Sequence, residues 1–176
     1  GIVIEPLDLN QLLINQQAQC VDRDGCVHVL MLHRRQEPGY EHPNYTTAAF
    51  STLATAYYHY FRNPTNGVWT TRRLPVDVYP VGSRPKIGSD AKGNVYVAYL
   101  SYPAGTAVPP GSTTGKLVIA SASKAARYTD WAVVQVNPAA FNGEPLLDQS
   151  RLLADNILAV YIQEHSTTTT VIGTAL

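Results

Sequence analysis

Hydrophobic and polar residues alternate along most of this chain, and the alternation recurs in units of roughly sixty residues. An acidic turn leads into an alternating strand at Asp22–Leu32 (D-R-D-G-C-V-H-V-L-M-L) and again at Asp90–Leu100 (D-A-K-G-N-V-Y-V-A-Y-L). A shorter copy, D-N-I-L-A-V-Y-I, spans Asp155–Ile162. Alternation of this kind is typical of strands that bury one face. The pattern therefore predicts an array of β-hairpins that must pack on their neighbours to form a core.

A second landmark lies between these copies. Polar turns close on Trp69 and on Trp131, and an apolar strand precedes each turn. Together the two landmarks predict units of four strands. The predicted strands are Asn15–Asp22, Val27–His33, Thr55–Arg62 and Val68–Leu74 in the first unit, Pro85–Ser89, Asn94–Leu100, Leu117–Ala122 and Trp131–Val136 in the second, and Pro145–Leu147, Ile157–Ile162 and Thr168–Ala175 in the third.

Units of four short antiparallel strands are typical of the blades of a β-propeller, so we expect an all-β fold. The blades would span about 9–80, 81–142 and 143–176, the last one strand short, within a single domain. A propeller needs at least about four blades to close. We therefore expect an N-terminal fragment of the same propeller, or further copies of the chain, to complete the ring. A sandwich of irregular hairpins is the alternative fold.

Composition narrows the possible partners. Hydrophobic residues make up 45% of the chain, and thirteen basic side chains balance thirteen acidic ones. The absence of net charge argues against a nucleic-acid partner, for which a basic surface would be expected. No apolar run approaches the length of about 20 residues that crosses a membrane. Eleven tyrosines and a low lysine content favour a secreted protein that handles carbohydrate.

Propellers bind ligands where their inner strands converge, so candidate binding residues should lie at strand starts and in the loops nearby. Asn15 and Gln16 open the first strand of the first unit, Arg84 that of the second and Glu144 that of the third. Arg34 lies at the far end of the second predicted strand, and Tyr40 lies in the long loop that follows it. Arg84 precedes a proline and presents a planar donor fork that suits a carboxylate. An ion pair between Arg84 and Glu144 is the alternative interpretation.

Two histidines on adjacent predicted strands, His33 and His59, could bind a divalent metal such as zinc or calcium, with a third ligand from Gln16, Cys20 or elsewhere. In the predicted register Cys20 lies too far along its strand to share a metal with His33. The alternative is that both are hydrogen-bonded strand histidines. His28 is interpreted as structural.

Two cysteines flank the first predicted hairpin turn. A two-residue turn at Asp24–Gly25 would place Cys20 opposite Val29, away from Cys26, and this register predicts free thiols rather than a disulfide.

Five stretches also carry a family resemblance: Leu13–His33, Tyr57–Arg62 (Y-Y-H-Y-F-R), Gly82–Lys86 (G-S-R-P-K), Tyr128–Trp131 (Y-T-D-W) and Gly143–Asp148 (G-E-P-L-L-D). They resemble the C-terminal half of BNR-repeat seven-bladed propellers, which include ulvan lyases and rhamnose–glucuronate lyases. The resemblance implies β-elimination on glucuronate within an acidic polysaccharide. In such a reaction a base removes the proton beside the carboxylate, an Arg or a metal neutralises the charge that develops, and a Tyr or His protonates the leaving oxygen.

The same resemblance places the catalytic His pair and Tyr–Arg pair on earlier blades. This chain would then supply one wall of the channel, with Arg84 contacting the carboxylate or sugar and a His33–His59 metal site beside it. Two other functions stay open: a propeller that binds carbohydrate without cleaving it, and a sialidase-type hydrolase. The hydrolase would need paired carboxylates and an Arg cluster that this segment does not show.

Overall fold

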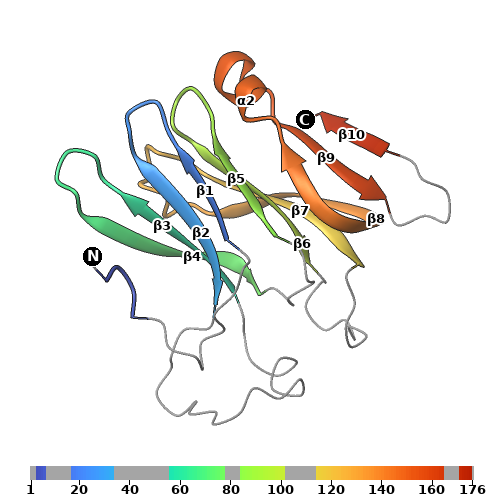
Figure 1. Cartoon of the computed structure of the whole chain (residues 1–176), viewed down its shortest axis with the longest axis horizontal. Helices are drawn as coiled ribbons and strands as arrows, with labels where there is room; N and C mark the ends of the chain where they lie inside the picture. Colours follow the sequence, from blue (N-terminus) through green and yellow to red (C-terminus); the bar gives the residue numbers. More distant parts are fainter. Residues whose placement is uncertain are drawn as a thin grey trace, which may run out of the picture.

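The computed structural model describes residues 3–6, 17–33, 56–77, 84–101, 114–164 and 171–175, which form two antiparallel sheets (Figure 1). The first sheet has the order β1 (Gln17–Val21), β2 (Val27–His33), β3 (Ala56–Arg62) and β4 (Trp69–Asp77). The second has the order β5 (Lys86–Ser89), β6 (Val95–Ser101), β7 (Thr114–Ala122), β8 (Ala132–Leu147), β9 (Ala159–Glu164) and β10 (Val171–Ala175). The predicted all-β, antiparallel class is confirmed, whereas the closed ring and its blade count stay predictions.

One long strand replaces two predicted short ones. We expected separate strands at Trp131–Val136 and Pro145–Leu147, but β8 runs through both and the segment between them. Its first part pairs with β7 and its last part with β9, and the register of the β9 ladder shifts between Asn142 and Leu146. Gly143, at φ 75°, provides the left-handed backbone conformation at this irregularity. The second and third units therefore share one continuous sheet.

A short helix that the sequence pattern did not predict, α2 (Gln149–Asp155), follows β8. The Asp148 carboxylate caps it by accepting a hydrogen bond from the Arg151 backbone N–H at 3.0 Å, and Asn156 ends it in a left-handed conformation. Leu152 anchors the helix in the core. The sequence signals for this helix were an aspartate at its N-cap, Asp148, and an asparagine just after its last residue, Asn156. Within the described residues, no helix has the length and apolar character needed to cross a membrane.

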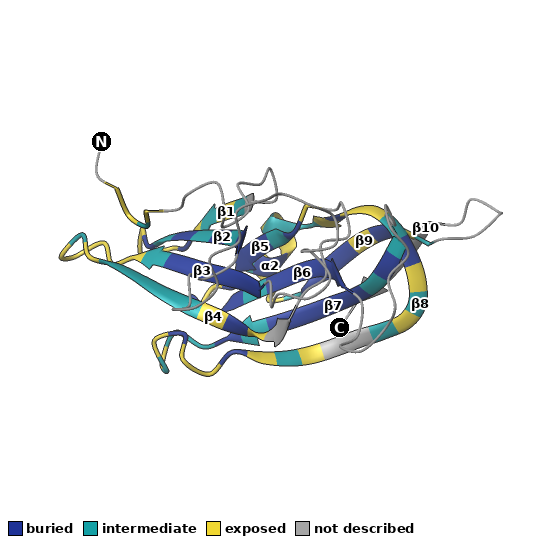
Figure 2. Cartoon of the chain, turned by 90° about the horizontal axis from the view of Figure 1, so that it is seen from below, coloured by how far each residue is buried: buried dark blue, intermediate teal, exposed yellow. Residues whose placement is uncertain are grey.

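Two apolar clusters join the units face to face. The first packs β2 and β3 against β6 and β7, with the rings of Tyr57 and Tyr99 4.9 Å apart. The second packs the opposite faces of β6 and β7 against β8, β9 and α2, through Phe141 and Leu152. Both faces of β6 and β7 are therefore covered, and Figure 2 shows these strands buried along most of their length. Burial between consecutive units is the packing that the repeat pattern predicts.

Helix α2 can lie on β5 only because residue 88 is glycine. A Cβ on Gly88 would collide with Gln149 Oε1 and lie 2.9 Å from Leu147 Cδ2 and 3.1 Å from Leu152 Cδ2.

We expect Gly88→Ala to lower the free energy of unfolding by about 1–3 kcal/mol through overpacking and Leu152→Ala by about 2–5 kcal/mol through a cavity. The double variant should lose less than the sum, because the cavity accommodates the added methyl group. Urea denaturation measures all three, and strict additivity would contradict the packing described.

Candidate functional site

The described residues include half of the side chains predicted to bind substrate or metal. Asn15, Gln16, Arg34 and Tyr40 lie outside the described residues. Arg84, Glu144, His33 and His59 lie within them. The structure brings Arg84 and Glu144 together and places His33 and His59 apart from each other.

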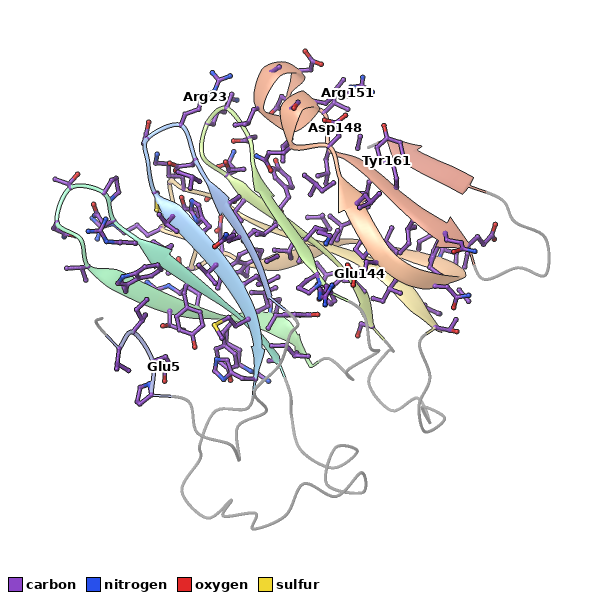
Figure 3. The ribbon with its side chains drawn as sticks, viewed as in Figure 1. Glu5, Arg23, Glu144, Asp148, Arg151 and Tyr161 are labelled. Atoms are coloured by element: carbon purple, nitrogen blue, oxygen red, sulfur yellow. The ribbon has the colours of Figure 1, made fainter. Side chains whose placement is uncertain are left out.

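Arg84 and Glu144 come together at the exposed start of β5. The Arg84 Nη1 atom lies 3.3 Å from Glu144 Oε1, which confirms the ion pair considered as the alternative for Arg84. Lys86, which the sequence analysis did not single out, places its Nζ atom 3.4 Å from Glu144 Oε2. Figure 3 labels Glu144 on β8, one residue beyond the left-handed Gly143. The irregularity in β8 therefore presents this carboxylate to both cations.

The Arg84–Lys86–Glu144 cluster is exposed to solvent and contains two basic side chains. The exposed fractions of the three side chains are 53%, 30% and 37%. Among the described residues, two cations share one carboxylate here, so the cluster can attract an anionic group. Exposed ion pairs contribute only about 0–1 kcal/mol to stability, so binding a ligand at the cluster would cost the fold little.

His33 and His59 do not form the predicted metal site, because they lie on opposite faces of the first sheet. His33 is paired with Ala56 in the β2–β3 ladder, whereas His59 is paired with Leu30. Leu30 and His33 are three residues apart on β2, and successive side chains of a strand alternate between faces. His33 Nε2 lies 2.6 Å from the Tyr60 hydroxyl, and its ring stacks on Tyr58 at 4.0 Å. The pleat of the sheet therefore rules out a shared ion.

His59 pairs instead with His28, the histidine interpreted as structural. The His59 Nε2 and His28 Nδ1 atoms lie 2.9 Å apart, and both side chains are fully buried. Tyr128 packs edge-on against both rings, and Trp131 packs edge-on against His59. Burial lowers the pKa of His28, an effect that Asp22 partly offsets, and burial lowers the pKa of His59 further, with contributions from His28 and Arg72. Both imidazoles are therefore neutral at pH 7.

The first hairpin turn differs from the predicted one by one residue. Asp22 Oδ1 accepts hydrogen bonds from the backbone N–H groups of Asp24 at 2.9 Å and Cys26 at 2.8 Å, so the turn extends over Asp22–Cys26. Cys20 consequently lies opposite His28 rather than Val29. The expectation of free thiols holds in the structure. Burial raises the pKa of Cys20 to about 12 and that of Cys26 to about 11.

This turn creates a buried group of three metal-ligating side chains. Ligand atoms of Asp22, Cys26 and His28 all lie within 4.8 Å of one another, and all three residues are buried. A carboxylate, a thiol and an imidazole at this separation could hold a metal ion. The sequence contained a signal for the group, an acidic turn residue followed by C-x-H, but the two-residue turn assumed for this hairpin concealed it.

Comparison with known proteins adds little to this geometry. No protein-family model and no curated protein sequence matches the chain. Among solved structures, the chain is similar to the crystal structure of the polysaccharide lyase Uly1, with a TM-score of 0.49 and 13% sequence identity. The match covers 94% of this chain and 28% of that one. The likeness falls short of showing a shared fold.

The buried imidazoles predict a loss of stability in mild acid. Because the pKa values of His28 and His59 are lowered on folding, their stabilising contribution is present above the unfolded pKa of about 6.5 and is lost as the pH falls below it. The free energy of unfolding should fall below pH 6.5 by up to about 1.4 kcal/mol per pH unit for each histidine. His59→Gln should lower by one the number of protons taken up on unfolding, so the free energy of unfolding should depend less steeply on pH. Urea denaturation between pH 7 and pH 5 tests it, and an unchanged slope in His59→Gln would refute it.

Proposed function

We propose that this chain forms part of an extracellular propeller lyase that cleaves the rhamnose–glucuronate linkage of an acidic polysaccharide by β-elimination. The observation that supports this function most directly is the exposed Arg84–Lys86–Glu144 cluster at the start of β5. The motifs that resemble BNR-repeat lyases, including the G-S-R-P-K stretch that contains Arg84, supply the reaction type. An N-terminal fragment of the same propeller would supply the catalytic groups.

In this proposal the cluster binds the uronate carboxylate. The guanidinium of Arg84 can donate two parallel hydrogen bonds to a carboxylate, and Lys86 adds a second positive charge. When a base removes the proton beside that carboxylate, negative charge spreads onto its oxygens, and fixed cations then stabilise the transition state more than the ground state. Glu144 would hold the two cations in place until substrate binds and would keep them from repelling one another.

A propeller that only binds carbohydrate is the second candidate, and one observation favours it. Every histidine in the described part of the chain, namely His28, His33 and His59, is buried. None of these imidazoles is therefore exposed beside Arg84 as a base. The binding function needs only the cluster, whereas the lyase function also needs catalytic groups from the rest of the propeller.

Incubating the assembled protein with a rhamnose–glucuronate polymer should generate the ultraviolet absorbance of an unsaturated uronate. Arg84→Ala should lower the rate of its appearance by at least about tenfold, because loss of one charge-assisted hydrogen-bond donor costs about 1.5–3 kcal/mol. Arg151→Ala is the matched control, since Arg151 is an exposed arginine on α2 whose ion pair is with Asp155. Polymer binding that Arg84→Ala weakens, without any unsaturated product, would reject the lyase and support the binding module.

A further inference from the structure

The β1–β2 hairpin and the β5–β6 hairpin have the same turn, each built on an aspartate, Asp22 or Asp90. The two hairpins differ in the side chains around the second carboxylate oxygen of that aspartate. In the second hairpin, Asp90 Oδ1 accepts from the backbone N–H groups of Lys92 at 2.8 Å and Asn94 at 2.9 Å. These bonds match those that Asp22 accepts from Asp24 and Cys26. The turn glycines also match, with φ of 79° at Gly25 and 80° at Gly93. The second hairpin therefore serves as an internal reference for the first.

The second hairpin satisfies its remaining carboxylate oxygen with hydrogen bonds. Asp90 Oδ2 accepts from Asn94 Nδ2 at 2.8 Å and from the Tyr96 hydroxyl at 3.4 Å. In the first hairpin Cys26 occupies the position of Asn94 and His28 that of Tyr96. Both exchanges replace hydrogen-bond donors of the reference hairpin with side chains that ligate transition metals.

The first hairpin leaves the corresponding atoms buried without a hydrogen bond. Asp22 Oδ2 and His28 Nε2 belong to fully buried side chains and have no hydrogen-bond partner within the described residues. They lie 3.6 Å apart, beyond hydrogen-bond distance. Lys124 Nζ also lies 3.6 Å from Asp22 Oδ2, and it forms its closer ion pair with Asp24. Unsatisfied buried polar atoms are costly, so two of them facing one another call for a third group between them.

We propose that Asp22, Cys26 and His28 bind one zinc ion. Zinc bonds to oxygen and nitrogen are about 2.0–2.2 Å long, so two such ligands of one tetrahedral ion lie about 3.4 Å apart, close to the observed 3.6 Å. A thiol and an imidazole favour zinc over calcium, which prefers oxygen ligands. On binding, the Cys26 thiol releases its proton to solvent and forms the zinc–sulfur bond. One thiolate and one carboxylate then balance the two charges of the ion, and these three residues supply three of its four tetrahedral positions.

His59 would act as a positioning residue behind this site. With zinc on His28 Nε2, the proton of that imidazole resides on Nδ1 and is donated to His59 Nε2, 2.9 Å away. A second hydrogen bond of this kind holds a ligating imidazole in one tautomer and orientation. The aromatic rings of Phe61, Tyr128 and Trp131 enclose the pair and exclude solvent. The site would therefore be structural, tying the first hairpin to the neighbouring hairpin at Gly93, whose added Cβ would lie 3.2 Å from Asp22 Oδ2.

Cobalt(II) provides a direct spectroscopic test in the complete chain. The apo protein, prepared with a chelator and titrated with Co²⁺, should bind one ion and show a thiolate-to-cobalt charge-transfer band together with the visible bands of a tetrahedral site. One equivalent of Zn²⁺ should bleach both. Cys26→Ser should lose the charge-transfer band, whereas Cys20→Ser, the matched control on the neighbouring strand, should retain it. The absence of a thiolate band in the wild-type protein, or its loss in Cys20→Ser with retention in Cys26→Ser, would overturn the proposal.

The reference hairpin allows a gain-of-site test that does not depend on a variant losing stability. Introducing Asn94→Cys and Tyr96→His together should create a second site and raise the cobalt stoichiometry from one to two.

Metal analysis of wild-type protein purified without a chelator should give one zinc per chain, and Zn²⁺ should raise the melting temperature of the apo protein. His59→Ala should weaken zinc binding about 10–100-fold while retaining the thiolate band. An unchanged stoichiometry in the double variant and no zinc in the wild-type protein would refute the site.

Discussion

The hydrogen bonds that a buried aspartate accepts at the β1–β2 turn and at the β5–β6 turn govern much of this structure. Asp22 and Asp90 each accept two backbone N–H groups of their own turn, and each is almost fully buried. These bonds fix the length of each turn and therefore the register of the two strands that the turn joins. Because side chains alternate between faces, a shift of one residue would exchange the buried and exposed faces of a strand.

The consequences of that register extend through the first sheet. It places Cys20 across from His28, and it puts His28 and His59 on the face that packs against β6 and β7. His33 takes the opposite face, against Tyr58 and Tyr60. The structure thus contains two histidine environments, and only the one beside Asp22 contains further metal-ligating groups among the described residues.

Two sites of different character emerge from this arrangement. The Arg84–Lys86–Glu144 cluster, which we propose binds an anionic sugar, is exposed and charged, and its ion pairs contribute little to stability. The Asp22–Cys26–His28 group is buried and enclosed by aromatic rings, as suits a structural ion. They lie in different units of the repeat.

The sequence by itself determined the all-β class, the hairpin repeats and most strand positions, because alternation and turn residues are local signals. It also indicated the Arg84–Glu144 pairing. Only the tertiary structure decided that β8 joins two units and that α2 rests on Gly88, because both depend on packing between distant segments. The metal-ligating group was not predicted, because the hydrogen bond that the Cys26 backbone N–H donates to the Asp22 carboxylate lengthens the turn by one residue, which periodicity does not encode.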